Sequence, residues 1–222
     1  MTTDPTNPPR PLFIVTEGGD GSGKTTLCRS LSERLGGLWT REPGGTALGQ
    51  TIRTLCLGLE HDPTPMAELL LMCADRAHHV ETLINPTLES GVTVVDDRYT
   101  YSSKAYQGAG RGMDGALLEQ LTTVATCGRE PDVVLVIHID AEVAKARLNA
   151  FGTAEFGATD RMEQENHEFH ERVRQSYLDQ AANDPRARII DGNGTEAEVL
   201  ERALHVLYEM FPWLGPNQSE RR

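Results

Sequence analysis

The sequence has 222 residues, of which 38% are hydrophobic and 24% charged, and its formal net charge at pH 7 is −12. This length suits one α/β domain, and the composition is that of an ordinary globular chain. The acidic balance argues against a protein that coats DNA or an anionic membrane, so we expect no nucleic-acid and no membrane partner. A small phosphate ligand is still possible, because it needs only a local cationic pocket.

The two ends of the chain have the composition of tails. Residues 1–11 have no apolar stretch behind their charge and do not resemble a secretory signal, and residues 214–222 are polar. We therefore expect a flexible N-terminal tail, a single domain over 12–213 and a loose C-terminal tail. The chain has no apolar run near the roughly 18 residues that a membrane helix needs. Its four cysteines are scattered, which favours a reducing cytoplasm over a disulfide or zinc framework.

The first half of the domain alternates short apolar runs with helical periodicity, as a parallel sheet covered by helices requires. Pro86 lies inside a long helical pattern, and proline should kink or end that helix near Ile84. The long helix carries an apolar stripe of Leu69, Leu70, Ala74, Ala77 and Val80. In chain order, the pattern predicts a strand at Leu12–Thr16, a helix at Lys24–Leu35, a strand at Leu38–Thr40, a helix from about Leu48 that turns Ile52 and Leu55 inward, and a helix at Met66–Glu89.

The second half continues the same alternation. Asp140 is a good N-cap for a helix that runs through Arg147, and the stretch Asn149–Thr159 has no clear period and is predicted as a loop. The alternation predicts an α/β fold of three layers, α/β/α, around a five-stranded parallel sheet. The further elements predicted are strands at Val92–Val95, Val133–Ile139 and Arg188–Ile190, and helices at Leu117–Val124, Met162–Ala182 and Glu196–Met210.

The sharpest signal is the segment from Gly18 to Thr25, which reads GGDGSGKT and matches the phosphate-binding pattern G-x-x-x-x-G-K-[ST] in full. Its glycines let successive backbone N–H groups turn toward a polyphosphate at the start of the following helix. Lys24 would reach the β- and γ-phosphates, and the Thr25 hydroxyl would bind Mg²⁺. The preceding strand and following helix argue against a chance match, although the loop alone does not separate kinases from GTPases or ATPases. The predicted nucleotide-binding residues are Gly18, Gly19, Asp20, Gly21, Ser22, Gly23, Lys24, Thr25 and Thr26.

Three further clusters follow predicted strands or lie on the long helix: TREPGGT at 40–46, DRAHH at 75–79 and DRYTYSSKAYQG at 97–108. Together with the P-loop, they resemble the thymidylate kinase family of P-loop nucleoside monophosphate kinases over about residues 13–190. The resemblance implies a P-loop NTPase-type fold with a short lid at about 147–161 and Mg²⁺-dependent phosphoryl transfer from ATP to dTMP. It also implies a homodimer formed through helices beside the sheet. The apolar face of the Met66–Glu89 helix could serve as that interface or be internal core.

The resemblance also implies roles for single residues. Phosphoryl transfer depends on positioning and charge neutralisation, and arginine binds phosphate oxygens in pairs. By the resemblance, Arg53 and Arg98 hold the acceptor phosphate, Asp20 lies near the sugar or Mg²⁺, and Tyr106 packs on the deoxyribose and disfavours a 2′-hydroxyl. Arg76, Ser103, Gln107 and Met72 face the base. The predicted catalytic residues are Lys24, Arg98, Asp20 and Arg147, and the predicted metal site is Thr25 with Asp97.

From the residues alone, several of these side chains have plainer interpretations. Arg98 could simply pair with the neighbouring Asp97, and Arg76 could be an ion-pair partner on a solvated helix face. Tyr106 fits core packing as well as a sugar contact. Lys104 is predicted to face solvent, His78 and His79 to be plain helix residues without metal-ligand spacing, and Asp96 to be a strand-end residue.

The lid and the base pocket depart from the family pattern. The variable P-loop positions are not basic, as in the bacterial branch that supplies a lid arginine instead, yet no basic residue lies between Arg147 and Arg161. Arg147 is therefore the predicted lid contact to ATP, and Arg161 could pair with Glu163 or Asp160. Met72 stands where the family usually has a phenylalanine, and His78 replaces a usual glutamine.

Three other functions remain open from the sequence. A related kinase could accept another pyrimidine monophosphate or a nucleoside, since Met72 can loosen the base pocket. A nucleotide-binding regulator without catalysis would fit the arginine-poor lid. A P-loop partition or uptake ATPase is the third alternative, and the net charge speaks against it.

Overall fold

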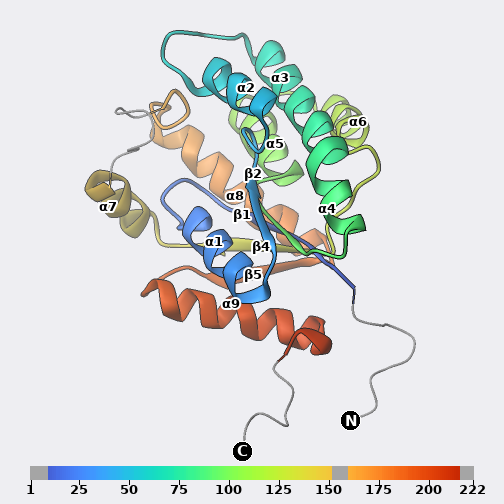
Figure 1. The fold of residues 1–222 in the computed structure, drawn as a ribbon. Helices are drawn as coiled ribbons and strands as arrows, with labels where there is room; N and C mark the ends of the chain where they lie inside the picture. Colours follow the sequence, from blue (N-terminus) through green and yellow to red (C-terminus); the bar gives the residue numbers. More distant parts are fainter. Residues whose placement is uncertain (1–9, 152–159, 216–222) are drawn as a thin grey trace, which may run out of the picture.

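The computed structural model describes residues 10–151 and 160–215. A single sheet of five parallel strands, in the order β2-β3-β1-β4-β5, lies between layers of helices (Figure 1), which confirms the predicted α/β/α fold. The strands are β1 (Phe13–Glu17), β2 (Leu38–Arg41), β3 (Val94–Asp97), β4 (Val133–His138) and β5 (Ala187–Asp191).

The strands are buried because helices cover both faces of the sheet. Alternate residues of β1 point to opposite faces: Val15 belongs to one core cluster and Ile14 to the other. Figure 1 shows α1 and α9 along one face of the sheet and α8 with the middle of the chain along the other. The helices are α1 (Lys24–Leu35), α2 (Ala47–Leu57), α3 (Pro65–His79), α4 (Asn85–Glu89), α5 (Thr100–Ser103), α6 (Gly115–Ala125), α7 (Ala141–Phe151), α8 (His167–Asn183) and α9 (Glu196–Met210). Two π-helical segments, η1 (Val80–Ile84) and η2 (Lys104–Gly110), and the 3₁₀ turn η3 (Pro212–Leu214) complete the described elements.

The register of β1 against β3 decides where the site forms. Thr16 lies opposite Asp97, so the P-loop after β1 and the Asp97-Arg98 pair at the end of β3 emerge at the same sheet edge. Carboxyl ends of parallel strands form the ligand crevice in open α/β sheets. The alignment therefore brings two motifs about eighty residues apart in the sequence into contact.

The predicted long helix is one continuous run of α3, η1 and α4. The π-helical geometry spans Val80–Ile84, just before Pro86, which lacks the N–H that an α-helix would use. The predicted inward stripe is wrong at two positions, because Leu70 is 48% exposed and Ala74 is also exposed. The helix instead buries polar groups together with apolar ones: Glu68, Leu69, Cys73, Asp75, Arg76 and His79.

Several boundaries differ from the prediction. β3 begins two residues later than predicted, and Val92 is on the surface. α7 continues past Arg147 to Phe151, and α8 begins at His167 rather than Met162, since the Asn166 side chain caps it by accepting from the N–H of Phe169. Leu55 is only partly buried, whereas Cys56 and Leu57 beside it are buried.

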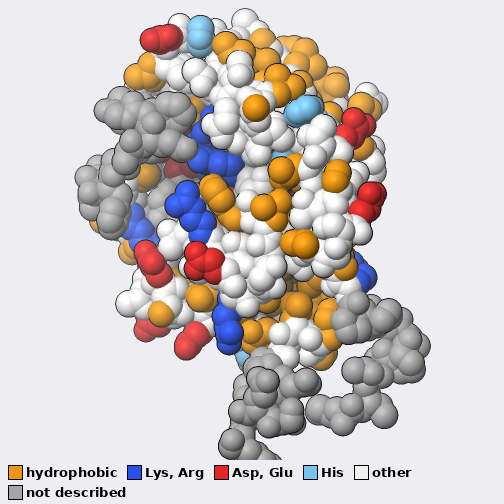
Figure 2. All heavy atoms as spheres, viewed as in Figure 1, with side chains coloured by type: hydrophobic (Ala, Val, Ile, Leu, Met, Phe, Trp, Pro, Cys, Tyr) orange, Lys and Arg blue, Asp and Glu red, His pale blue; other side chains and the backbone are white. Residues whose placement is uncertain are grey.

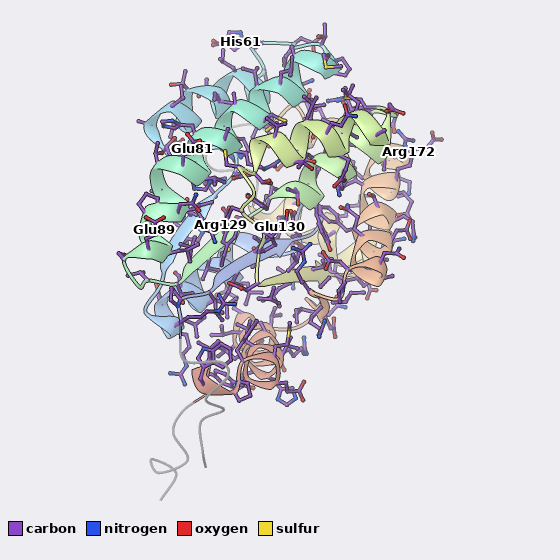
Figure 3. The ribbon with its side chains drawn as sticks, turned by 90° about the vertical axis from the view of Figure 1, so that its right-hand side faces the viewer. His61, Glu81, Glu89, Arg129, Glu130 and Arg172 are labelled. Carbon is purple, nitrogen blue, oxygen red and sulfur yellow. The ribbon has the colours of Figure 1, made fainter. Side chains whose placement is uncertain are left out.

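The segment after Arg98, which carries much of the predicted site, forms α5 and η2 although no helix was predicted there. Arg172 of α8 donates to the carbonyls of Ala109 at 3.0 Å and Gly110 at 2.9 Å, and so holds η2 against α8 (Figure 3). Most of the predicted tails and most of the predicted lid, at 1–9, 216–222 and 152–159, lie outside the described residues. Among the described helices, none has both the length and the apolar character needed to cross a membrane.

Candidate active site

The P-loop has the backbone conformation that its glycines predict. Gly18 and Gly21 have φ of +141° and +76°, which L side chains rarely adopt. A Cβ at Gly18 would lie 2.5 Å from the Ile137 carbonyl oxygen, and one at Gly21 would lie 2.8 Å from that of Ala144. The two glycines therefore let the loop pass close to β4 and α7 while α1 starts directly behind it at Lys24.

Lys24 lies in the cradle of the loop. Its Nζ donates to the Gly19 carbonyl at 2.7 Å, and the side chain is almost wholly buried. Burial, and then the nearby Arg98 guanidinium, lower the pKa of Lys24 to about 8. A phosphate placed in the cradle would supply the negative charge that the buried ammonium otherwise lacks.

The predicted metal ligands lie side by side. The Thr25 hydroxyl donates to Asp97 Oδ2 at 2.5 Å, and the other Asp97 oxygen is buried with no hydrogen-bond partner among the described residues. Buried polar atoms normally have a partner, so this oxygen and the hydroxyl beside it fit a hard cation such as Mg²⁺.

Arg98 joins the two motifs at the sheet edge. Its φ is +79°, a left-handed conformation that costs a non-glycine residue about 1–3 kcal/mol and turns the side chain toward the P-loop. Its guanidinium donates to Asp20 at 2.5 Å, to the Tyr177 hydroxyl at 2.9 Å and to the Gly18 carbonyl at 3.3 Å. The plain interpretation of Arg98, a pair with Asp97, is therefore wrong; its partner is Asp20.

Asp20 completes this junction. It accepts from the Tyr106 hydroxyl at 2.8 Å, and that hydroxyl also lies 3.2 Å from Arg98. Burial acts to raise the pKa of Asp20, but Arg98 and Lys24 outweigh it, so the pKa is lowered and the carboxylate stays ionised. Tyr106 combines both of its open interpretations: its ring packs against Phe169 and its hydroxyl belongs to the polar junction.

A cavity of about 380 Å³ brings together part of the P-loop and all of the predicted substrate residues. Figure 2 shows several Lys and Arg side chains around a hollow in the left half of the view. The predicted site residues that line the cavity are Asp20, Gly21, Gly23, Lys24, Thr25, Thr26, Arg53, Met72, Arg76, Asp97, Arg98, Ser103, Tyr106 and Gln107.

The far end of the cavity is built around Arg76. Its guanidinium donates to Glu42 at 2.8 Å, to the Ser103 hydroxyl at 3.1 Å and to the Tyr99 carbonyl at 2.9 Å. Arg76 is only 3% exposed, so the alternative of an ion pair on a solvated helix face is wrong. These three contacts fix the plane of the guanidinium, whose remaining N–H groups can reach a ligand.

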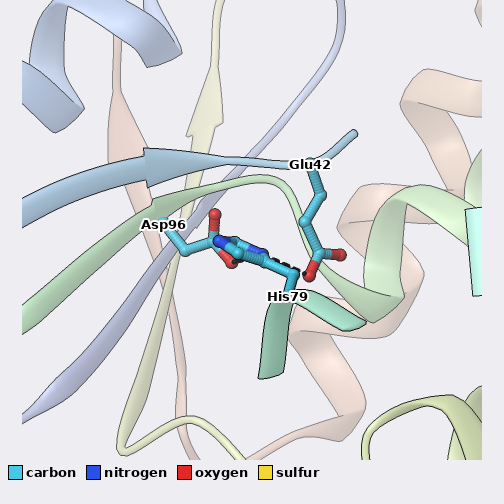
Figure 4. A group of neighbouring side chains, drawn as sticks. All are labelled: Glu42, His79 and Asp96. Atoms are coloured by element: carbon cyan, nitrogen blue, oxygen red, sulfur yellow. Dashed lines mark hydrogen bonds and ion pairs between the residues drawn. The ribbon is translucent and has the colours of Figure 1, made fainter. Parts of the chain in front are cut away.

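A second layer of buried acids, unnoticed in the sequence, holds the arginines. Glu42 lies 3.0 Å from Nδ1 of His79 (Figure 4). Glu42 also accepts from Arg76, and Nε2 of His79 lies 2.7 Å from the Thr40 hydroxyl. Ligating atoms of Glu42, His79 and Asp96 lie within 4.8 Å of one another, but Arg76 and Thr40 already engage this chain, which therefore serves to position Arg76. Burial, and then Glu42 and Asp97, raise the pKa of Asp96 well above its usual range.

His79 and Asp96 are thus more than the plain helix residue and strand-end residue that the sequence indicated. Glu17 was also missed: it is fully buried and accepts from the N–H of Tyr99 at 2.8 Å and from the Ser102 hydroxyl at 2.6 Å. A signal existed for each of them, because a charged residue inside an apolar strand or on a buried helix face needs a partner.

The two arginines that flank the predicted lid are both tied to the body of the domain. Arg147 donates to the carbonyls of Ser22 at 3.4 Å, Gly192 at 3.0 Å and Gly194 at 3.3 Å, and so joins the P-loop to the loop after β5. Arg161 forms a structural ion pair with the buried Glu68, a partner that the sequence did not predict. Lys104 pairs with Glu119 at 2.5 Å and is 38% exposed, away from the cavity.

This combination of fold and site defines a P-loop protein in which the triphosphate cradle opens onto an arginine-lined pocket for a second anionic ligand. Comparison with known proteins gives the particular family. The family profile described as thymidylate kinase matches residues 16–203. The chain belongs to the thymidylate kinase family.

Curated relatives and a solved structure agree with that assignment. The chain is 46% identical over 200 residues to a thymidylate kinase of Leifsonia xyli subsp. xyli, covering 88% of this chain and 93% of the relative. It is 46% identical over 208 residues to one from a Synechococcus strain, covering 90% and 96%. The crystal structure of thymidylate kinase from Ehrlichia chaffeensis superimposes with a TM-score of 0.73 at 30% identity, covering 90% of this chain and all of that one.

The lowered pKa of Lys24 predicts a pH-dependent stability of the ligand-free protein. A buried lysine whose folded pKa is about 8 is less protonated than in the unfolded chain, so its stability penalty shrinks as pH rises from 8 toward 10.5. Between pH 7.5 and 9.5 the wild type should gain about 2 kcal/mol relative to Lys24→Met. Urea unfolding of both proteins at the two pH values measures this difference. A difference that does not change with pH would contradict the prediction.

Proposed function

We propose that this chain transfers the γ-phosphoryl group of ATP to dTMP, giving ADP and dTDP, with both nucleotides bound in the cavity described above. The observation that carries the proposal is the cavity of about 380 Å³, whose lining includes both Lys24 of the P-loop and Arg98, the proposed ligand of the acceptor phosphate. Two anions repel each other as they approach, so a cation on each side lowers the barrier.

The acceptor nucleotide would lie with its phosphate near Arg98 and Arg53 and its base near Arg76. Arginine suits both ends because its planar fork donates paired hydrogen bonds to phosphate and to carbonyl oxygens. Tyr106 would pack against the deoxyribose between the two ends, with its hydroxyl directed to Asp20. Ser103, Gln107 and Met72 would surround the base, since all three line the same cavity.

Mg²⁺ would be held at Thr25 and Asp97, where a hydroxyl and a buried carboxylate oxygen lie together. When bound, Mg²⁺ neutralises charge on the transferring phosphoryl group and on ADP, the leaving group. Lys24 and the P-loop N–H groups would orient the donor phosphates, and Arg98 would hold the acceptor phosphate in line with them.

We also propose that the chain forms a homodimer and works in a reducing cytoplasm. A homodimer is supported by large apolar side chains of α3 and α6 that lie on the surface rather than in the core. Met66, Leu70 and Val124 are 40%, 48% and 76% exposed. Figure 2 shows hydrophobic side chains gathered over the upper part of the molecule, where α2 and α3 lie in Figure 1. A reducing cytoplasm is supported by the four free cysteines, of which three are buried.

ADP release with different acceptors tests the proposed reaction. With ATP and Mg²⁺, we expect fast release with dTMP, release about 10- to 100-fold slower with dUMP, which lacks one methyl group, and almost none with dGMP or without acceptor. Lys24→Met gives the background rate. Equal rates with dTMP and dUMP would mean that Met72 leaves the pocket open to several pyrimidines. ATP binding without release for any acceptor would contradict the kinase assignment and favour a regulator.

Arg147 is the proposed lid-side contact to ATP. Arg147→Ala should lower kcat at least about tenfold and raise the KM for dTMP much less, because the lost contact lies on the donor side. Arg202→Ala is the matched control: Arg202 donates to the carbonyl of Asp191 at the end of β5 and to that of Asn193 in the following loop, but not to the described P-loop. An equal effect of both variants on kcat would reduce Arg147 to a loop-stabilising residue.

A further inference from the structure

Glu68, near the start of α3, is a buried carboxylate with several hydrogen-bond donors around it. Its side chain has no exposed surface, yet four hydrogen bonds reach its two carboxylate oxygens. Arg111 donates to both oxygens at 3.2 Å, Arg161 donates to Oε2, and Gln107 donates its amide N–H to Oε1 at 2.8 Å. A carboxylate offers about four acceptor positions, so Glu68 is fully occupied.

The arginines prevent Glu68 from turning away. Arg111 also binds Glu165 at 2.5 Å, and Arg161 also donates to the Cys56 carbonyl at 3.2 Å. The carboxylate is thus held from two sides by groups that are anchored elsewhere. Removing charge from such a site leaves a guanidinium without its partner, which is costly inside a protein. Glu68 is therefore a fixed acceptor, whatever binds in the cavity.

A fixed acceptor decides how the Gln107 amide is oriented. An amide has a donor end and an acceptor end, and a carboxylate that only accepts must face the NH₂ group. The Gln107 carbonyl oxygen is then the end left for the cavity, which Gln107 lines. Across the same cavity, Arg76 offers only N–H donors. The base therefore meets one fixed acceptor and one fixed donor.

We propose that Glu68 is a positioning residue that sets base specificity by locking Gln107 with its carbonyl oxygen toward the base. The inference rests on the proposed function, in which a pyrimidine monophosphate binds with its base at this end of the cavity. An imide pyrimidine such as thymine presents an N3–H donor and an O4 acceptor, which match Gln107 and Arg76. An amino pyrimidine such as cytosine presents an N3 acceptor and a 4-amino donor, which oppose both.

Glu68→Gln tests the locking. The amide that this substitution introduces at position 68 can donate to the Gln107 carbonyl, so the Gln107 amide is free to flip and offer N–H to the base. We expect the ratio of kcat/KM for dTMP to that for dCMP to fall about tenfold or more, through a higher KM for dTMP. Arg111→Ala is the control, because Arg161, anchored at the Cys56 carbonyl, still holds Glu68 and the Glu68–Gln107 contact stays in place. Its ratio should stay at the wild-type value.

A second change should restore what the first removes. In Glu68→Gln/Gln107→Glu, the carboxylate at position 107 offers only acceptors in either orientation, and the amide at position 68 donates to it. The preference for dTMP should therefore return toward the wild-type ratio. If Glu68→Gln does not fold, Glu68→Asp replaces it, because aspartate keeps the negative charge beside Arg111 and Arg161. Its ratio of kcat/KM for dTMP to that for dCMP should also fall.

Two results would overturn the inference: an unchanged ratio in the Glu68 variants, with both acceptors slowed equally, or the same fall in Arg111→Ala. Melting temperatures of all variants separate loss of folding from loss of selectivity. A wild-type enzyme that phosphorylates dTMP and dCMP equally would instead contradict the proposed acceptor, and the inference with it. A wild-type preference for dTMP that survives every Glu68 variant would leave the proposed function intact and remove the role of Glu68 alone.

Discussion

The ion pair between Arg98 and Asp20 joins the two halves of the site. Asp20 belongs to the P-loop after β1, and Arg98 directly follows β3, so the pair exists only because these neighbouring strands are in register. The contacts of the Arg98 side chain to Asp20, Tyr177 and Gly18 offset the energetic cost of its strained backbone. A shift in this register would therefore move the phosphate cradle away from the acceptor pocket, even if every residue were unchanged.

Carboxylates hold four arginines of the domain in the same way, and two of these, Arg98 and Arg76, line the cavity. Asp20 holds Arg98, Glu42 holds Arg76, and Glu68 holds Arg111 and Arg161. Buried ion pairs add little net stability, because desolvation consumes most of the attraction. Their effect here is geometric: a guanidinium with a fixed carboxylate partner presents its remaining donors in one direction. This explains how a chain of net charge −12 can keep a cationic pocket for two anionic substrates.

The sequence predicted the parts of the site that depend on local order. The P-loop, its strand and its helix lie within one short segment, and their backbone geometry follows from glycines and periodicity. The structure also places Arg98, Arg76 and Gln107 in one cavity, as the resemblance implied. Contacts such as Glu42 with His79 and Glu68 with Arg161 join residues 37 and 93 positions apart. Neither secondary-structure propensity nor hydrophobic periodicity carries information about such partners, so the sequence did not predict these contacts.

One signal for the missed layer was nevertheless present on α3. The apolar stripe assigned to it placed Leu70 and Ala74 inward, although both are exposed. The buried polar residues Glu68, Asp75, Arg76 and His79 recur with the spacing of a single helix face. A stripe of charged residues at that spacing indicates a helix that forms the wall of a polar cavity, because only paired or ligand-facing charges can be buried. Periodicity of polar residues should therefore be read as closely as periodicity of apolar ones when a helix adjoins a phosphate-binding loop.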